Sequence, residues 1–191
     1  MSMDIKYKLE FFSYWHCGSG LSAGADVDQL VVKDENGLPF VPGKTIKGLI
    51  REAAEELSRL NPAKYASVQD LVEVFGKIPT AEESESTPSS GCAFFSNAEF
   101  PEVDKAEIIK KELPKFLFER ITSTAIDKNG IAKDTSLRKM EVALPCTLTG
   151  MICGLPEKTE STIVDAMKFV KRLGENRNRG LGRCMFTVIK N

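Results

Sequence analysis

Apolar and polar residues alternate along residues 4–16, and the apolar members are Ile5, Tyr7, Leu9, Phe11 and Trp15. Successive side chains of a β-strand point to opposite faces of a sheet, so an alternation of period two predicts a half-buried strand. We therefore expect the first strand to lie here, with Phe11 and Trp15 in the core.

A different period follows between residues 46 and 57. Its apolar residues recur at steps of three and four, which places them on one face of a helix: Ile46, Leu49, Ile50, Ala53, Ala54 and Leu57. Pro62 is expected to end this helix because proline cannot continue the hydrogen-bond ladder. Further helices are predicted over 68–75, over 105–113 up to Pro114, and over 162–173.

Short apolar runs predict further strands over 30–32, 92–95, 138–152 and 184–189. Leaving the insertion aside, the order is strand, helix, strand, strand, helix, strand. This order is typical of a ferredoxin-like α+β fold, an antiparallel sheet with helices on one face, as in RNA-recognition modules. We expect one domain over 1–191, with an inserted subdomain or hairpin over about 102–137 and a mobile loop over 81–90.

Composition narrows the class of protein. The chain has 191 residues, of which 42% are hydrophobic and 28% charged, and no apolar run is long enough to cross a bilayer. Its start does not read as a signal peptide, so a cytoplasmic location is expected. The five cysteines form no CxxC pair and His16 is the only histidine, which argues against a zinc site or a mechanism that needs two imidazoles.

Charge is unevenly distributed although the formal net charge is only -1. Residues 81–104 carry six acidic residues and no Lys or Arg, whereas residues 168–190 carry seven basic residues and one acidic residue. A local basic patch attracts a polyanion whatever the total charge. A solvated helix end and strand would give the same pattern, so charge alone leaves both interpretations open.

The tripeptide Gly43-Lys44-Thr45 before a helix invites comparison with a phosphate-binding P-loop, but the glycine spacing is wrong and Pro42 lacks the N–H that such a loop uses. A nucleotide-binding enzyme is therefore disfavoured. An anion can still bind at a helix N-terminus, where Lys44, Lys47 and Arg51 would assist.

A basic segment flanked by glycines, GENRNRGLGR over residues 174–183, precedes the last strand. Small residues allow the backbone to approach a ligand closely, and arginine offers planar donors that suit phosphate. Alone this is a weak signal, because a turn between helix and strand needs glycine in any case.

Several segments taken together resemble the RAMP superfamily of CRISPR-associated proteins. The glycine-rich segment over 174–183 is similar to that superfamily's hallmark loop, and FVPGKTIKGLIR over 40–51 resembles its PGSSLKG helix start. Residues 16–20 (HCGSG) resemble its His-Gly-Gly loop, residues 92–98 its second strand, and residues 122–145 its thumb hairpin. The resemblance covers nearly the whole chain, in order.

Within that superfamily the chain is most similar to the backbone subunit of type III (Csm/Cmr) effector complexes. The resemblance implies a subunit that binds guide RNA (crRNA) and complementary target RNA, self-associates into a filament and contacts other effector subunits. It also implies RNA contacts by His16, Lys44, Lys47, Arg51, Arg177, Asn178, Arg179 and Arg183. No tightly bound cofactor and no membrane contact are expected.

The resemblance further implies metal-dependent cleavage of target RNA by Asp28. The family has a proline two residues after this aspartate, where this chain has Leu30. Asp26 and Asp28 share one face of an extended segment, so both are candidate ligands of a divalent cation, expected to be Mg²⁺. On the residues alone, both are ordinary loop carboxylates.

Alternatives remain at this level. A non-catalytic RNA-binding subunit of the same assembly would share every motif except the role of Asp28. A repeat-processing ribonuclease would depend on His16 rather than on a metal, although such enzymes have two ferredoxin-like domains. His16 can also be interpreted as a structural histidine at a strand end whose hydrogen bonds are satisfied within the protein. Lys47 and Arg51 can also be interpreted as part of a solvated helix face. Ile126 and Met140 on the expected thumb are either base wedges or core residues.

Overall fold

The computed structural model describes residues 2–21, 27–77, 89–125, 127–131 and 136–189. Its strands are β1 (Ser2–Phe11), β2 (Gly76–Lys77), β3 (Ser89–Ser90), β4 (Phe94–Phe95), β5 (Phe118–Ser123), β6 (Arg138–Ala143), β7 (Thr147–Pro156) and β8 (Cys184–Ile189). Its α-helices are α1 (Gly43–Leu60), α2 (Val68–Phe75), α3 (Glu102–Lys110) and α4 (Glu160–Phe169). Short 3₁₀ turns are η1 (Pro114–Phe116), η2 (Glu157–Thr159) and η3 (Arg177–Arg179). None of the helices in these ranges combines the length and apolar character needed to span a bilayer.

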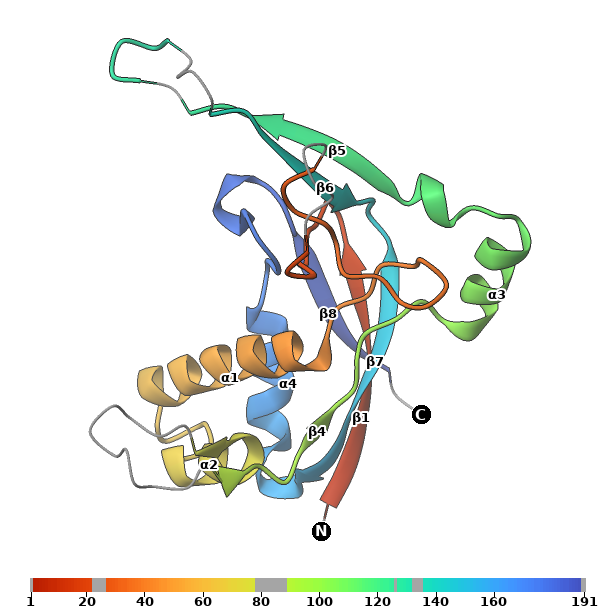
Figure 1. Cartoon of the computed structure of the whole chain (residues 1–191). Coiled ribbons are helices and arrows are strands. Elements are labelled where there is room, and N and C mark those ends of the chain that lie inside the picture. Colours follow the sequence, from red (N-terminus) through yellow and green to blue (C-terminus); the bar gives the residue numbers. More distant parts are fainter. Residues whose placement is uncertain (1, 22–26, 78–88, 126, 132–135, 190–191) are drawn as a thin grey trace.

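A four-stranded sheet in the order β4-β7-β1-β8 forms the centre of the molecule, and every neighbouring pair is antiparallel. The helices α1, α2 and α4 lie on one side of it (Figure 1). This strand order, with one helix after the first strand and another before the last, is that of the ferredoxin-like fold. The predicted α+β class with an antiparallel sheet is confirmed.

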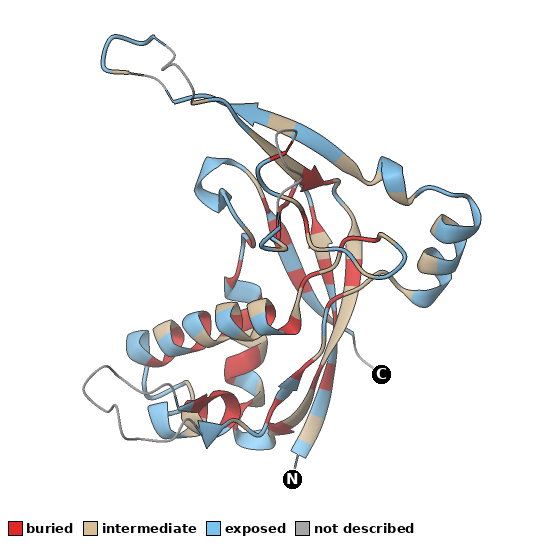
Figure 2. Cartoon of the chain, in the orientation of Figure 1, coloured by how far each residue is buried: buried red, intermediate tan, exposed pale blue. Residues whose placement is uncertain are grey.

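The core lies between this sheet and the helices, where the buried residues of Figure 2 gather. The predicted alternation of β1 is observed: Ile5, Tyr7, Leu9 and Phe11 are buried and the residues between them are not. Trp15 is also buried and its ring stacks on Phe11 at 4.5 Å between centroids. The apolar stripe of the first strand is therefore core, as predicted.

Helix α1 begins where its glycine meets strand β4. A Cβ on Gly43 would lie 2.1 Å from the carbonyl oxygen of Phe95, so only glycine fits this contact. The Gly43 N–H donates to Asn97 Oδ1 at 3.0 Å, which satisfies one of the unpaired donors at the helix start. The tripeptide that resembles a P-loop is thus a packing contact between α1 and β4.

Residues 102–143 leave the sheet as an additional unit. They form α3, η1 and the antiparallel hairpin of β5 and β6, which extends away from the sheet (Figure 1). The continuous strand predicted over 138–152 is wrong. The chain divides it at Leu144–Cys146, around Pro145, and β6 and β7 belong to different sheets.

The bounds of the other predicted elements agree with the structure or differ from it by a few residues. The helix over 68–75 and the strand over 184–189 have the predicted bounds. The last helix ends at Phe169 rather than at 173, because Val170 adopts an extended conformation. Residues 30–32 form no strand; Val31 makes one isolated bridge, with Gly18. The predicted mobile loop over 81–90 lies mostly outside the described residues, and its last two residues form β3.

The contact at Gly43 predicts opposite outcomes for two glycines of α1. Gly43→Ala should destabilise the fold by about 1–3 kcal/mol, because the added methyl group meets backbone atoms. The matched control is Gly48→Ala, whose Cβ would meet nothing within 4 Å. It should stabilise the helix by about 0.5–1 kcal/mol. Urea unfolding of both variants tests this, and a Gly43→Ala protein as stable as the wild type would contradict it.

Candidate nucleic-acid interface

A groove of about 740 Å³ lies between the glycine-rich loop and the β5–β6 hairpin. One wall comes from residues of the loop, and the other comes from the hairpin and from Gln29. The residues that line it include Gln29, Ile121, Met140, Glu175, Arg177, Asn178 and Arg179. The structure therefore brings together two segments that the sequence singled out separately, the loop and the expected thumb.

The glycine-rich loop is anchored at both ends to the chain that continues from β1. Glu175 N–H donates to the His16 carbonyl at 2.9 Å, and Gly182 N–H donates to the Tyr14 carbonyl at 2.7 Å. Gly182 has φ +67, and a Cβ there would lie 1.8 Å from the Leu173 carbonyl oxygen. The loop can close back on itself only because that position is glycine.

The arginines stand at the outer turn of this loop. Arg177, Asn178 and Arg179 form η3 and are exposed. The guanidinium groups of Arg177 and Arg179 make no ion pair or side-chain hydrogen bond with any described residue. Arg172 supports the turn by donating from Nη1 to the Arg177 carbonyl at 2.5 Å. Two unpaired cations thus border the groove on a braced turn.

The predicted catalytic residue, Asp28, is the neighbour of Gln29 in the wall that faces the loop. Asp28 is exposed, its N–H donates to the Lys139 carbonyl at 2.9 Å, and its Oδ2 accepts from Lys139 N–H at 2.7 Å. The next residue, Gln29, lines the groove and donates to Glu175 Oε2 at 3.0 Å. Asp28 is therefore fixed to strand β6, next to the groove that the arginines border.

The carboxylates suit a divalent cation only in a limited way. Asp26 lies outside the described residues. Within the ranges that the structure describes, no group of three or more His, Cys, Asp or Glu side chains could hold a metal ion. Mg²⁺ is usually coordinated by one or two carboxylates, with water and phosphate oxygens as its other ligands. Asp28 can supply one such carboxylate. A site made entirely of protein ligands does not fit these residues.

His16 does not reach the surface. It is 0% exposed, and its Nδ1 lies 2.6 Å from the Glu141 carbonyl oxygen. A carbonyl only accepts, so Nδ1 carries the proton, and Nε2 is left buried without a hydrogen-bond partner among the described residues. The predicted direct contact between His16 and RNA is not supported by this arrangement; its ring joins the chain after β1 to strand β6.

Glu141 is a site residue that the sequence did not single out. Its side chain is 13% exposed, and it accepts from Lys33 Nζ at 2.9 Å and from Val31 N–H at 3.1 Å. These bonds tie the segment that carries Asp28 to the hairpin. Glu141 falls in an alternating run with no distinguishing motif, so no local signal could have marked it.

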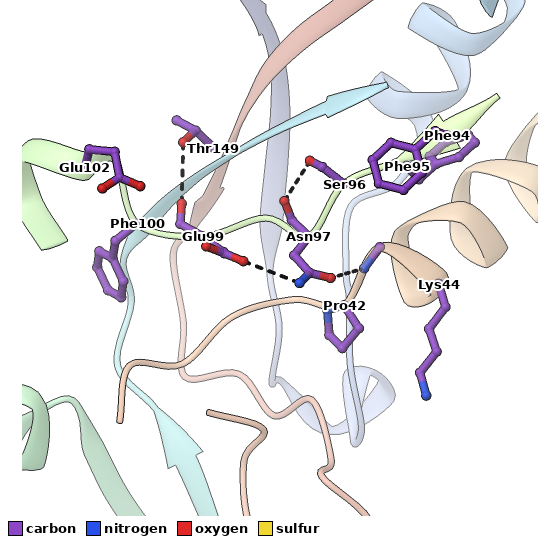
Figure 3. A pocket seen from close by; sticks show the side chains of 11 residues that line it. Pro42, Lys44, Phe94, Phe95, Ser96, Asn97, Glu99, Phe100, Glu102 and Thr149 are labelled. Atoms are coloured by element: carbon purple, nitrogen blue, oxygen red, sulfur yellow. Dashed lines mark hydrogen bonds between the residues drawn. The ribbon is translucent and has the colours of Figure 1, made fainter. Parts of the chain in front are cut away.

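The basic residues of α1 lie elsewhere. Lys44 and Lys47 border a separate pocket of about 340 Å³ against residues 90–95. Lys44 also borders a pocket of about 580 Å³ at the start of α1, where its side chain points away from Glu99 and Glu102 (Figure 3). Arg51 is 20% exposed and pairs with Glu55 at 2.7 Å. None of the three lines the groove of the glycine-rich loop.

Arg183 also lies outside the groove. It precedes the buried Cys184 of β8, and its guanidinium carbon is 5.9 Å from the centroid of the half-exposed Phe12 ring. Their backbones are also joined, because Phe12 N–H donates to the Arg183 carbonyl at 2.9 Å. The predicted RNA contacts thus separate into a loop group (Arg177, Asn178 and Arg179), a helix group (Lys44, Lys47 and Arg51) and the single Arg183.

The sequence matches the model of one protein family, and the fold is similar to chains in solved structures. The sequence model of the RAMP superfamily matches residues 8–185. The structure described as the Type III-B Cmr-beta bound to cognate target RNA contains a chain with a TM-score of 0.71 and 12% identity, and the match covers 97% of both chains. A chain of the Type III-B Cmr-beta in the apo state has a TM-score of 0.66 and 13% identity, over 99% of this chain and 98% of that one. No curated protein matches the sequence.

The Glu141 contacts predict a stability effect far from any motif. Glu141→Gln should destabilise the protein by about 1–3 kcal/mol, because it removes the charge that Lys33 pairs with and one acceptor oxygen. Glu119→Gln, at an exposed position of β5, should change stability by less than about 0.5 kcal/mol. Urea unfolding measures both, and equal stability of the two variants would refute the role of Glu141.

Proposed function

The chain belongs to the RAMP superfamily, and from this premise we propose that it is a guide-RNA-binding subunit of a type III CRISPR effector complex. The observation that carries the proposal is the groove between the hairpin and a loop with two unpaired arginines. The similarity in fold to chains of Type III-B Cmr-beta, one of them bound to cognate target RNA, supports it.

The groove has the chemistry that a ribose-phosphate strand needs. Arg177 and Arg179 present planar donors that match phosphate oxygens, and Asn178 adds an amide between them. Met140 and Ile121 give the hairpin wall apolar surface for bases. Because phosphate contacts carry no sequence information, binding is expected to depend on salt more than on base sequence.

Lys44 and Lys47 are proposed as a second, separate phosphate contact. Neither makes an ion pair or side-chain hydrogen bond with a described residue, and both lie within the first turns of an 18-residue helix. Arg51 contributes less, because Glu55 already neutralises it. Arg183 is proposed as a further contact, beside the half-exposed Phe12 ring.

We further propose that Asp28 makes the chain a metal-dependent endoribonuclease acting on target RNA. Lys139 N–H fixes one carboxylate oxygen of Asp28, which leaves Oδ1 available. That oxygen can hold Mg²⁺ or accept the proton of a 2′-OH positioned in line with the next phosphate. Mg²⁺, when bound, would stabilise the charge that develops on that phosphate.

A non-catalytic subunit of the same complex is the second candidate. The observation that favours it is the sparse donor set, in which Asp28 is the one described carboxylate proposed for the metal. A repeat-processing ribonuclease that depends on His16 is disfavoured, because the imidazole is buried. Other effector subunits and further copies of this chain in a filament are the proposed protein partners.

Removing one arginine should weaken binding of single-stranded RNA in a salt-dependent way. Arg177→Ala and Arg179→Ala should each reduce the slope of log affinity against log salt concentration by about 0.7, the value for one phosphate contact on a single strand. Lys110→Ala, on the exposed surface of α3, is the charge-matched control and should leave the slope unchanged. Fluorescence anisotropy titrations give the slopes. Arginine variants that behave like Lys110→Ala would overturn the RNA-binding proposal.

Asp28→Asn separates binding from cleavage. The amide retains an oxygen that can accept from Lys139, so RNA affinity and stability should not change. Cleavage of a guide-paired target should fall by about a hundredfold or more, because the base and metal ligand is lost. Glu119→Gln is the control that should cut at the wild-type rate. If Asp28→Asn cuts at the wild-type rate, or if EDTA does not stop the wild type, the metal-dependent role of Asp28 is overturned; if the wild type does not cut, the non-catalytic candidate stands.

A further inference from the structure

A second groove, of about 520 Å³, lies on the other side of the arginine turn. It separates the flank of α1 from the end of α4, and the residues that decide its chemistry are Leu49, Glu52, Ala53, Phe169, Arg172 and Arg177. It differs from the RNA groove in having an aromatic ring at its edge.

That ring belongs to Phe169, the last residue of α4, which is 50% exposed. Leu49, Ala53 and Val170 provide apolar surface beside it. A phenyl ring that is half open to solvent next to further apolar surface is suited to stacking with a flat, weakly polar group.

Charge in the groove is divided between its two sides. Arg172 and Arg177 line the side of the glycine-rich loop, and Arg172 is held there by its bond to the Arg177 carbonyl. Glu52 and Glu56 line the side of α1. Glu56 is paired with Arg59, but Glu52 repels a phosphate, which favours a nucleotide bound with its phosphate at the arginines and its base toward α1 and Phe169.

The two grooves meet at one turn. Arg177 and Asn178 line both of them, so a strand that contacts Arg177 in the first groove has the second groove as its immediate neighbour. The occupant that this continuity favours is therefore a nucleotide of the same RNA strand rather than a protein segment.

We propose that the groove between α1 and α4 is a base-binding subsite, in which Phe169 stacks on one base of the RNA strand while Arg172 and Arg177 hold its phosphate. This rests on the proposed RNA-binding function and adds to it a site and a base-contacting residue. Because every base has a π-face, the stacking should be tolerant of sequence.

The single native tryptophan permits a direct test. Trp15 is the only tryptophan of the chain and is 0% exposed against Phe11, so its fluorescence should not respond to ligand. In Phe169→Trp, single-stranded RNA should quench the new indole, because a stacked base lies against it. Inorganic polyphosphate is a polyanion without bases and should bind without quenching. Phe116→Trp, at a position that is 62% exposed on η1, is the matched control and should not be quenched by RNA.

Affinity gives a second readout that does not require tryptophan at this position. Phe169→Ala should weaken RNA binding by about fivefold or more, the lower bound for one stacked base, without changing the salt slope. Phe169→Tyr keeps the ring and should bind as the wild type does. One set of results would overturn the subsite and leave the proposed function standing. In it, RNA binds with a salt slope that depends on Arg177, but RNA does not quench the fluorescence of Phe169→Trp and its affinity is unchanged in Phe169→Ala. Failure of the wild-type chain to bind RNA at all would overturn both.

Discussion

The arrangement of the site depends on one stretch of extended backbone, Tyr14–His16, that is hydrogen-bonded on both edges. The carbonyls of Tyr14 and His16 accept from Gly182 and Glu175 of the glycine-rich loop. Trp15, between them, exchanges two hydrogen bonds with Ala143 of β6, at 3.1 and 2.8 Å. Backbone groups of an extended chain alternate in direction, so three residues can hold the loop on one edge and the hairpin on the other. The loop and the hairpin, which form the two walls of the groove, are thus held by the same three residues.

Side chains then fix this stretch in place. The Trp15 indole is buried against Phe11 and donates from Nε1 to the Leu144 carbonyl at 3.0 Å, and His16 donates to the Glu141 carbonyl. An imidazole turned outward to contact RNA could not make that bond. The buried His16 is therefore better understood as a positioning residue of the groove than as a ligand contact.

The sequence pattern predicted correctly those elements that are determined by interactions between residues close to one another in the chain. Helix α2 has a capping box in which Ser67 and Asp70 satisfy each other's backbone N–H, and its bounds were predicted correctly. The alternation of β1 also translated directly into buried and exposed faces. The fold class followed from the order of these elements.

What the sequence could not provide was the relation between distant segments. Lys47, Arg51 and the arginines of the loop were all singled out by charge. Yet the lysines of α1 lie beside β4, whereas Glu52 and Glu56 line the groove beside the loop. Which flank of a helix faces which loop depends on how α1 packs on the sheet, and no local spacing encodes that packing. Glu141, Gln29 and Glu175 were missed for the same reason, since each bond that they make across the site spans more than 100 residues.

The same long-range bonds bear on how a single carboxylate could serve the proposed cleavage. Asp28 exchanges two hydrogen bonds with Lys139 of β6, while Lys33 and Val31, a few residues further on, bind Glu141 of the same strand. Strand β6 is in turn joined through Trp15 and His16 to the loop that carries Arg177 and Arg179. The Asp28 carboxylate and the two arginines thus belong to one continuous hydrogen-bonded frame. A reaction that depends mainly on the position of a 2′-OH relative to the next phosphate needs such a frame more than it needs many catalytic groups.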